Sequence, residues 1–432
     1  MKAGFSKADI TPPLGTKMMG VGGRDTESGC TDIHDPIFAR AAWFCHEDES
    51  ALIISFDLCF LGRDDSDRMK SIIGRELDLL PRQILLTATH SHVSPAVGQW
   101  HSAGFRRPDL LYLRALENAT LDAARNARET ARDATLWVGS GNSRLPMCRR
   151  LWANGVMENA PNPQGFVDDS LNVCLVKDEG DKPLALLFAV AAHPSIVRGF
   201  EISAEFPGVA CDRLDDYLDS EASLFLQGAG GDSKPSTIAA SNGQWKWDAS
   251  WSETQETGNV LADEVIELIE AGLTRVEPKI ETALIETFWP LQTAPPRAEF
   301  EKIATAPNDD PTRVAWAQRQ IECLDKYGKL PGAAPVLFQG VQLGKGLRLI
   351  AIEGEPVSHY GRMMREAFPG GTTFPLGYAN GEAMYLVTSP MLDEGGMESQ
   401  SYWEFGMPAP LAPGMESVVE DALTRLSELG IG

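Results

Sequence analysis

The chain has 432 residues, of which 43% are hydrophobic and 23% charged, the proportions of a globular protein with a large core. Its net charge of −23 repels nucleic acid and anionic lipid, so we expect neither as a partner. The sequence contains no apolar run long enough to cross a bilayer and no apolar leader, which favours a cytoplasmic protein without stable membrane insertion. Seven scattered cysteines without CxxC spacing fit reduced thiols in that compartment.

The first part of the chain predicts alternating strands and helices. Residues 39–44 and 51–57 read as paired strands, helical spacing follows at 65–80, and a new apolar strand begins at Ile84. This β-α-β order is typical of an α/β protein. A long amphipathic helix is expected over 108–133.

Residues 139–168 are rich in Gly, Asn and Pro, and we expect them to be irregular. Beyond them the pattern predicts strands at 184–192, 224–227, 283–288, 336–343 and 347–352, and helices near 208–219, 259–271, 311–327 and 413–429. Prolines gather at 275–310, which is the best candidate for a boundary between sub-domains. The expected fold is therefore α/β, with mixed sheets layered with helices.

Two histidines end the strand that begins at Ile84. In an extended chain, residues i and i+2 point to the same face, so His90 and His92 reach into one cleft at the carboxyl end of the strand. Such a pair is either half of a metal site or a pair of hydrogen-bonded histidines. Asp57 ends the preceding strand, where its carboxylate either orients a ligating histidine or caps the next segment.

Other strand ends carry polar groups of the same kind. A second apolar strand ends at His193, and a later one ends at a pair of carboxylates that includes Glu355. Arg149 and Arg150 fall in the segment expected to be irregular; they are either solvated, or partly buried and able to hold a carbonyl or carboxylate.

Two further stretches could border a site. The glycine-rich turn at 227–235 follows a strand, but its spacing matches no phosphate-binding motif, so a nucleotide site is not expected. Trp245, Trp247 and Trp251 lie in a polar stretch, where they line a ligand pocket or pack a long loop.

Six short blocks occur along the chain in a fixed order: Ile10–Gly15, Thr87–His92, Ala191–Pro194, Gln227–Asp232, Gly354–Pro356 and Tyr385–Thr388. As an ordered set they resemble the catalytic domain of the neutral/alkaline ceramidase family of zinc amidases, from about residue 4 to about residue 406. The resemblance implies one catalytic domain over residues 1–432, without the C-terminal immunoglobulin-like domain that the family's ceramidases carry.

The resemblance also implies roles for single residues. It implies one zinc ion per chain, held by His90, His193, Glu355 and Tyr385. His92 matches the histidine beside the bound water, and Tyr402 matches a later tyrosine of the family. The arginine that contacts the substrate corresponds to Arg149 or Arg150, and the sequence leaves both open.

The sequence departs from the family at the substrate side. Lys234 occupies the position of a family serine, and Ser233 is displaced from it by one residue. We expect Asp232, Ser233, Lys234 and Trp100 to lie near the substrate. This departure and the missing immunoglobulin-like domain leave open whether ceramide is a substrate.

The expected function is hydrolysis of a linear N-acyl amide by water that zinc activates. His92 would move the proton, and Tyr402 with Arg149 or Arg150 would stabilise the oxyanion. Two alternatives are an esterase or lactonase with a small soluble substrate, and a metal-containing binding protein whose Lys234 ammonium fills the substrate position.

Overall fold

Alternating apolar side chains build a four-layer α/β/β/α arrangement in the computed structural model, which describes residues 1–432 except 22–23, 25–27, 99–107, 221 and 307–308. Successive residues of a strand point to opposite faces of its sheet. Ile54 therefore packs in a core under helices, whereas Ile53 packs in a second core between two sheets. Ile350 and Leu349 also point to opposite faces of their sheet. Leu349 packs in the core between the two sheets, and Ile350 packs in a third core under the helices on the other side of the second sheet. The expected class, mixed sheets layered with helices, is confirmed.

The larger sheet has the strand order β14-β12-β11-β8-β1-β4-β5-β6, with β16 paired to β8. Most neighbours are antiparallel, but β5 runs parallel to β6 and β12 runs parallel to β14. Its strands are β1 (Lys2–Asp9), β4 (Phe38–His46), β5 (Glu49–Phe56), β6 (Ile84–Ala88), β8 (Arg132–Asn142), β11 (Ser170–Asp178), β12 (Pro183–Val190), β14 (Ser223–Gln227) and β16 (Thr274–Val276).

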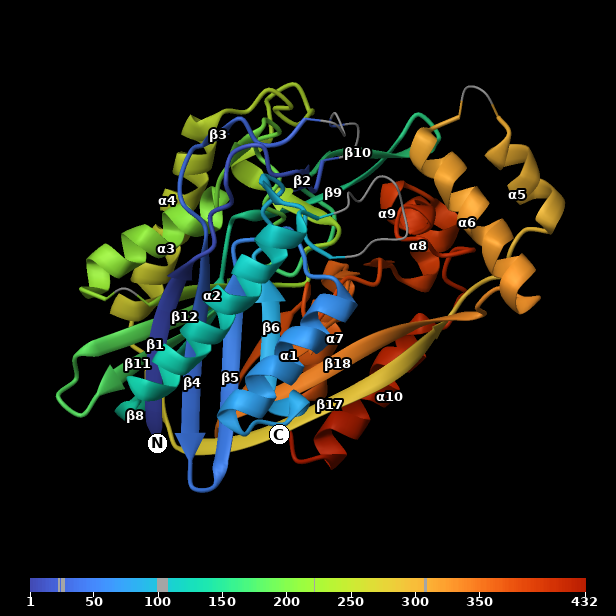
Figure 1. The fold of residues 1–432 in the computed structure, drawn as a ribbon. Helices are drawn as coiled ribbons and strands as arrows, with labels where there is room; N and C mark the ends of the chain where they lie inside the picture. Colours follow the sequence, from blue (N-terminus) through green and yellow to red (C-terminus); the bar gives the residue numbers. More distant parts are fainter. Residues whose placement is uncertain (22–23, 25–27, 99–107, 221, 307–308) are drawn as a thin grey trace.

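Four helices cover one face of this sheet. They are α1 (Arg63–Leu77), α2 (Leu110–Glu129), α3 (Glu205–Leu218) and α4 (Trp251–Glu270). Figure 1 shows α1 and α2 side by side over β4, β5 and β6. Helix α4 begins eight residues before the expected 259 because Ser250 and Glu253 form a capping box at its start.

The second sheet has the order β17-β18-β19-β21, with β19 parallel to β21. Its strands are β17 (Pro278–Pro290), β18 (Ala333–Gly344), β19 (Leu347–Ile352) and β21 (Thr372–Leu376). Helices α7 (Ser358–Ala367) and α10 (Met415–Glu428) cover its outer face, and α5 (Arg297–Ala304) and α6 (Pro311–Tyr327) project beyond one end of β17 and β18 (Figure 1). The chain passes from the first sheet to the second inside the proposed boundary region, yet both sheets share a core, so that boundary stays a prediction.

The expectation of an irregular segment at 139–168 is wrong. The chain there forms the end of β8 and a hairpin of β9 (Pro146–Ala153) and β10 (Val156–Asn162). Its turn is Asn154-Gly155, with φ angles of 55° and 81°. Asn-Gly is the pair that tight hairpin turns favour, because both positions need a positive φ. This local signal outweighs the glycine- and proline-rich composition.

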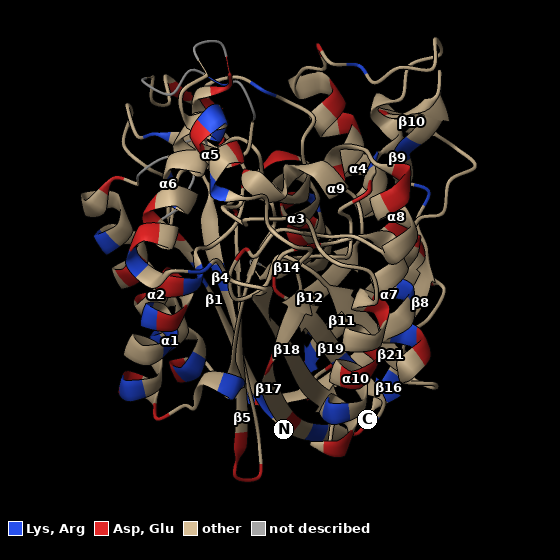
Figure 2. Cartoon of the chain, turned by 90° about the vertical axis from the view of Figure 1, so that its right-hand side faces the viewer, with Lys and Arg blue, Asp and Glu red and all other residues tan. Residues whose placement is uncertain are grey.

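Short elements complete the structure at the end where the parallel strands finish. They are β2 (Met18–Met19), β3 (Asp32–Ile33), β7 (Ser94–Pro95), β13 (Glu201–Ile202), β15 (Ser233–Pro235), β20 (Glu355–Pro356), β22 (Tyr385–Leu386), α8 (Ser389–Glu394) and α9 (Met397–Gln400). Figure 2 shows acidic and basic residues interspersed along the outer helices, whereas the strands hold few of them. Among the described helices, none combines the length and apolar character that crossing a bilayer requires.

Candidate metal centre

Parallel strands of both sheets deliver the candidate ligands to one place. His90 and His92 follow β6, His193 follows β12, Glu355 lies just beyond β19, and Tyr385 follows β21. The end of β21 and the residues after it join the two outer strands of the large sheet, because Leu376 bridges Gly228 next to β14 and Ala379 bridges Thr87 of β6. The carboxyl ends of parallel strands share one edge, and these bridges bring edges from both sheets together.

The three imidazoles meet at their Nε2 atoms. The distances are 2.9 Å between His90 and His193, 3.0 Å between His92 and His90, and 2.9 Å between His92 and His193. Each Nε2 carries either a hydrogen or a lone pair, so in a triangle at least two of the three atoms are alike and repel. Hydrogen bonds therefore cannot satisfy this triangle, whereas a cation bound by all or most of the nitrogens can.

A carboxylate completes the cluster. Glu355 Oε2 lies 3.4 Å from His90 Nε2 and 4.0 Å from His193 Nε2, and this buried oxygen has no hydrogen-bond partner. The donor set of imidazole and carboxylate fits zinc. A second group, Cys59 with His90 and His92, uses the opposite ring nitrogen of His90, since Cys59 Sγ lies 3.8 Å from Nδ1.

Tyr385 stands directly beside Glu355. The two residues are paired across the short parallel strands β20 and β22, so their side chains leave the backbone on the same side. Tyr385 lines the cavity described below, and the Arg149 guanidinium lies 5.5 Å from the centroid of its ring. Gly231 allows this packing: a Cβ there would lie 2.7 Å from the Glu355 carbonyl oxygen.

Backbone carbonyls fix the histidine rings. His90 Nδ1 lies 2.7 Å from the Cys59 carbonyl oxygen, and His193 Nδ1 lies 3.4 Å from that of Gly230. Both contacts leave Nε2 to face the centre. Burial, followed by neighbouring positive groups, lowers the pKa of His92 and His193 well below the usual range, so these imidazoles are neutral and their lone pairs can bind a cation.

The idea that Asp57 orients a ligating histidine is wrong. Its Oδ2 accepts hydrogen bonds from the Phe38 backbone N–H at 2.9 Å and from Arg40 at 2.5 Å. Asp57 and Arg40 form a buried ion pair inside the large sheet, away from the histidines. The carbonyl of Cys59, two residues later, performs the orienting role, and a carbonyl leaves no signal in the residue type.

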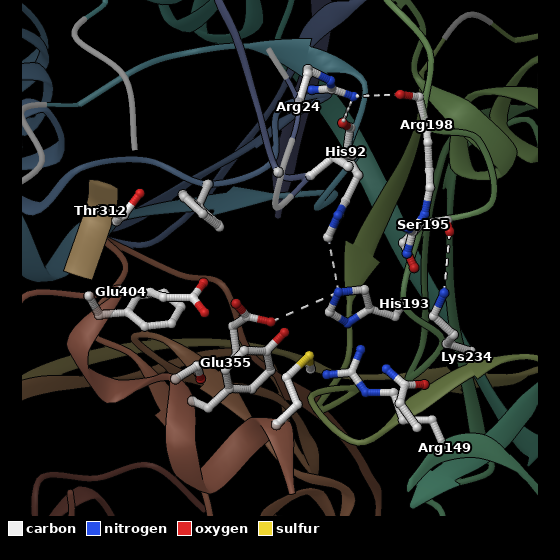
Figure 3. A pocket seen from close by; sticks show the side chains of 18 of the residues that line it. Arg24, His92, Arg149, His193, Ser195, Arg198, Lys234, Thr312, Glu355 and Glu404 are labelled. Atoms are coloured by element: carbon white, nitrogen blue, oxygen red, sulfur yellow. Dashed lines mark hydrogen bonds and ion pairs between the residues drawn. The ribbon is translucent and has the colours of Figure 1, made fainter. Parts of the chain in front are cut away.

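A cavity of about 540 Å³ opens onto the cluster. That volume suits a small-molecule ligand. His92, His193, Glu355 and Tyr385 line it, whereas His90 lies fully buried behind them. Figure 3 shows His193 and Glu355 facing each other in the middle of this cavity.

The two arginines occupy different places. Arg149 lines the cavity and donates to Glu398 Oε1 at 2.9 Å and to the Gly231 carbonyl oxygen at 2.6 Å. Arg150 donates to Glu398 Oε2 at 2.6 Å and reaches Glu394 at 3.1 Å. Burial raises the pKa of Glu398, but the two guanidinium groups outweigh it and hold the pKa below its usual value. One carboxylate thus anchors both side chains and leaves Arg149 at the site.

Of the remaining candidate residues, some line the cavity and others hold the structure around it. Tyr402 packs its ring against Trp316 of α6, 6.2 Å between centroids, while its neighbours Ser401 and Trp403 line the cavity. Asp232 accepts from the backbone N–H and the hydroxyl of Ser358 at the start of α7. Ser233 donates to the Ala191 carbonyl oxygen, next to His193.

Lys234, on the opposite side of the strand from Ser233, lines the cavity. Trp247 lines it as well, whereas Trp245 is buried in the loop that carries both. Trp100 lies outside the described residues.

Sequence reasoning missed Tyr378. Its ring lies against that of His90, with 4.1 Å between centroids, and its buried hydroxyl has no hydrogen-bond partner. The residue has a φ of 53°, which an L-residue adopts rarely. Its backbone carbonyl accepts from Ala88 at the end of β6, so the loop is held against the histidine strand. The tyrosine-rich stretch after β21 was the only signal in the sequence.

No family model matches the sequence, and no curated protein matches it. Solved structures match it over its whole length, among them the following two. The neutral ceramidase from Pseudomonas aeruginosa has a TM-score of 0.73 at 16% sequence identity, with 100% of this chain and 73% of that chain covered. A structure described as ceramidase complexed with C2 has a TM-score of 0.75 at 16% identity, with 100% and 76% covered. The chain therefore has a neutral ceramidase-like fold, as the resemblance predicts.

Proposed function

We propose that this protein is a zinc-dependent hydrolase of a linear N-acyl amide. The observation that carries the proposal is the triangle of Nε2 atoms of His90, His92 and His193, which has no hydrogen-bonding solution, beside the unpartnered oxygen of Glu355. A cation bound by His90 and His193 would remove the conflict between their two nitrogens and would give the Glu355 oxygen a partner. The ceramidase-like fold supports amide hydrolysis as the chemistry.

His90, His193, Glu355 and Tyr385 would hold the ion. Both histidines are almost fully buried, and their rings are fixed from behind by carbonyls. Zinc bound there supplies Lewis-acid polarisation of a carbonyl and a water whose pKa lies near 7. His92 is the most exposed of the three histidines and lines the cavity, so we assign it the transfer of the proton from water to the leaving amine.

Arg149 is the donor that we assign to the developing oxyanion. The residue is 2% exposed, and Glu398 and the Gly231 carbonyl fix the orientation of its guanidinium without using every N–H. A fixed donor in a desolvated site costs little reorganisation during the reaction. A contribution from Tyr402 stays a prediction, since its ring is packed against Trp316.

The test combines metal analysis with matched substrates. Purified protein should carry about one zinc per chain, and it should hydrolyse an N-acyl amide faster than it hydrolyses the ester with the same acyl group, relative to each uncatalysed rate. Removal of the metal by a chelator should abolish turnover, and added zinc should restore it. Preference for the ester would favour an esterase, and binding of amides without turnover would favour a binding protein.

A further inference from the structure

Lys234 is a buried amine without a carboxylate partner, and it lines the cavity. Burial lowers the pKa of this amine to about 7, so its charged form lacks the stabilisation that a nearby anion would give. Its side chain is 3% exposed. The ammonium donates one long hydrogen bond, 3.4 Å, to the Ser195 carbonyl oxygen, and no described carboxylate lies within ion-pair distance of it. A buried charge in this state is costly unless something neutralises it.

The surroundings add positive charge and a flat aromatic surface. Lys234 Nζ lies 4.8 Å from the ring centroid of Trp247, and the Arg198 guanidinium lies 4.5 Å from the same ring. Both cations line the cavity. The field of Glu205 reaches Lys234, but burial raises the pKa of that carboxyl to about 8, so it is largely uncharged at neutral pH.

The cavity therefore has basic side chains on one side and an acidic side chain on the other. Figure 3 shows Lys234 and Arg198 on one side of His193 and Glu355, and Glu404 with Thr312 on the opposite side. The cluster that would hold the metal lies between the two sides. A substrate whose amide reaches this cluster places one of its ends beside Lys234.

We propose that the substrate is an amide that carries a carboxylate, and that Lys234 binds this carboxylate with Arg198 beside the face of Trp247. This inference rests on the proposed function and narrows its substrate class. The neighbouring Arg149 is already paired with Glu398, whereas the Lys234 amine has no carboxylate partner among the described residues, so a carboxylate of the substrate would supply the anion that Lys234 lacks. A neutral lipid amide would leave Lys234 without this partner.

The test compares four short amides with the same chain length. Two carry a carboxylate: N-hexanoylglycine, and an N-propyl amide with a carboxylate at the end of the acyl chain. The other two are the neutral N-propylhexanamide and the phosphonate N-hexanoylaminomethylphosphonate. Wild-type protein should prefer one of the two carboxylates over the neutral amide in kcat/KM by about ten- to a hundredfold, the range of a charged hydrogen bond. Lys234→Met should reduce this ratio by the same factor, and Lys234→Arg should restore part of it. Lys246→Met, an exchange in the same loop outside the cavity, is the control.

Binding separates the two proposals. Calorimetry with N-hexanoylglycine reports carboxylate recognition even if no amide is turned over, in which case the hydrolase proposal fails and this one stands. If wild type and Lys234→Met show the same kcat/KM ratio between the carboxylate and the neutral amide, only the carboxylate proposal is overturned. It is also overturned if wild type prefers the neutral amide. A preference for the phosphonate that depends on Lys234 would overturn the carboxylate in favour of a doubly charged group.

Thermal unfolding distinguishes a binding role from a structural one. Methionine keeps most of the apolar stem and removes a buried charge, so Lys234→Met should unfold at the same temperature as wild type or higher. A lower melting temperature would assign Lys234 to loop packing and overturn the proposal.

Discussion

Glu355 and Tyr385 lie opposite each other in the parallel pair of β20 and β22, although 29 positions separate them in the chain. A carboxylate of the histidine cluster and a phenol that lines the cavity thus come from adjacent strands of one backbone ladder. Parallel strands need a long connection between them, and here α7, β21 and the loop around Tyr378 supply it. The pairing makes the relative position of these two side chains a property of the backbone.

The first prediction tests which histidine binds the metal and which one acts as the general base. We expect His90→Ala to lower zinc affinity at least a hundredfold, because it removes a buried ligand, and turnover should disappear with the metal. His92→Ala should keep about one zinc per chain and lose turnover. Zinc bound after dialysis against a competing chelator measures both. Loss of zinc from His92→Ala equal to that from His90→Ala would make His92 a ligand.

The second prediction compares the two arginines, which share Glu398. Arg149→Met should lower kcat about 10²–10³-fold, the usual effect of removing one oxyanion donor. Arg150→Met should lower the melting temperature and change kcat far less, because its bonds go to Glu398, Glu394 and a carbonyl. Steady-state kinetics and thermal unfolding of both proteins check this; the reverse order of kcat would exchange their roles.

The third prediction concerns the hydroxyl of Tyr402. The ring is packed beside Trp316, so Tyr402→Phe preserves that contact and tests the hydroxyl alone. We expect kcat to fall less than tenfold, well below the effect of Arg149→Met. A fall of a hundredfold or more with unchanged KM would place the hydroxyl at the oxyanion in the reacting complex.

The fourth prediction concerns pH and Glu205. Its Oε1 accepts from the backbone N–H groups of Ile196 and Val197, which holds the loop after His193. Burial raises the pKa of this carboxyl from 4.5 to about 8. Between pH 4.5 and about 8 the folded state holds a proton on Glu205 that the unfolded state has released. The contribution of this carboxyl to the free energy of unfolding is therefore full below pH 4.5 and is lost as the pH rises to about 8.

Glu205→Gln keeps the acceptor oxygen and removes the titration. The free energy of unfolding of wild type should therefore fall relative to this variant as pH rises, by at most about 1.4 kcal/mol per pH unit. Urea unfolding at a series of pH values measures the difference, and Glu256→Gln, an exposed change on α4, is the control. Parallel curves for wild type and Glu205→Gln would show that the carboxyl is already ionised.

The sequence alone determined which residues end the buried strands. Nearly continuous apolar runs set β6, β12 and β19, and the polar residues that follow them, His90, His193 and Glu355, are the candidate ligands. These inferences depend on local patterns, because a buried strand must be apolar throughout and its end is the first place where a polar side chain can point into a cleft.

Only the tertiary structure decided how these ends meet and which neighbours face them. The choice of Arg149 for the cavity depends on Glu398, about 250 residues further along the chain. Lys234 becomes a buried amine without a carboxylate partner only because Trp245, Trp247 and the Ser195 loop fold over it. Such contacts join segments that are remote in sequence, so no local pattern records them.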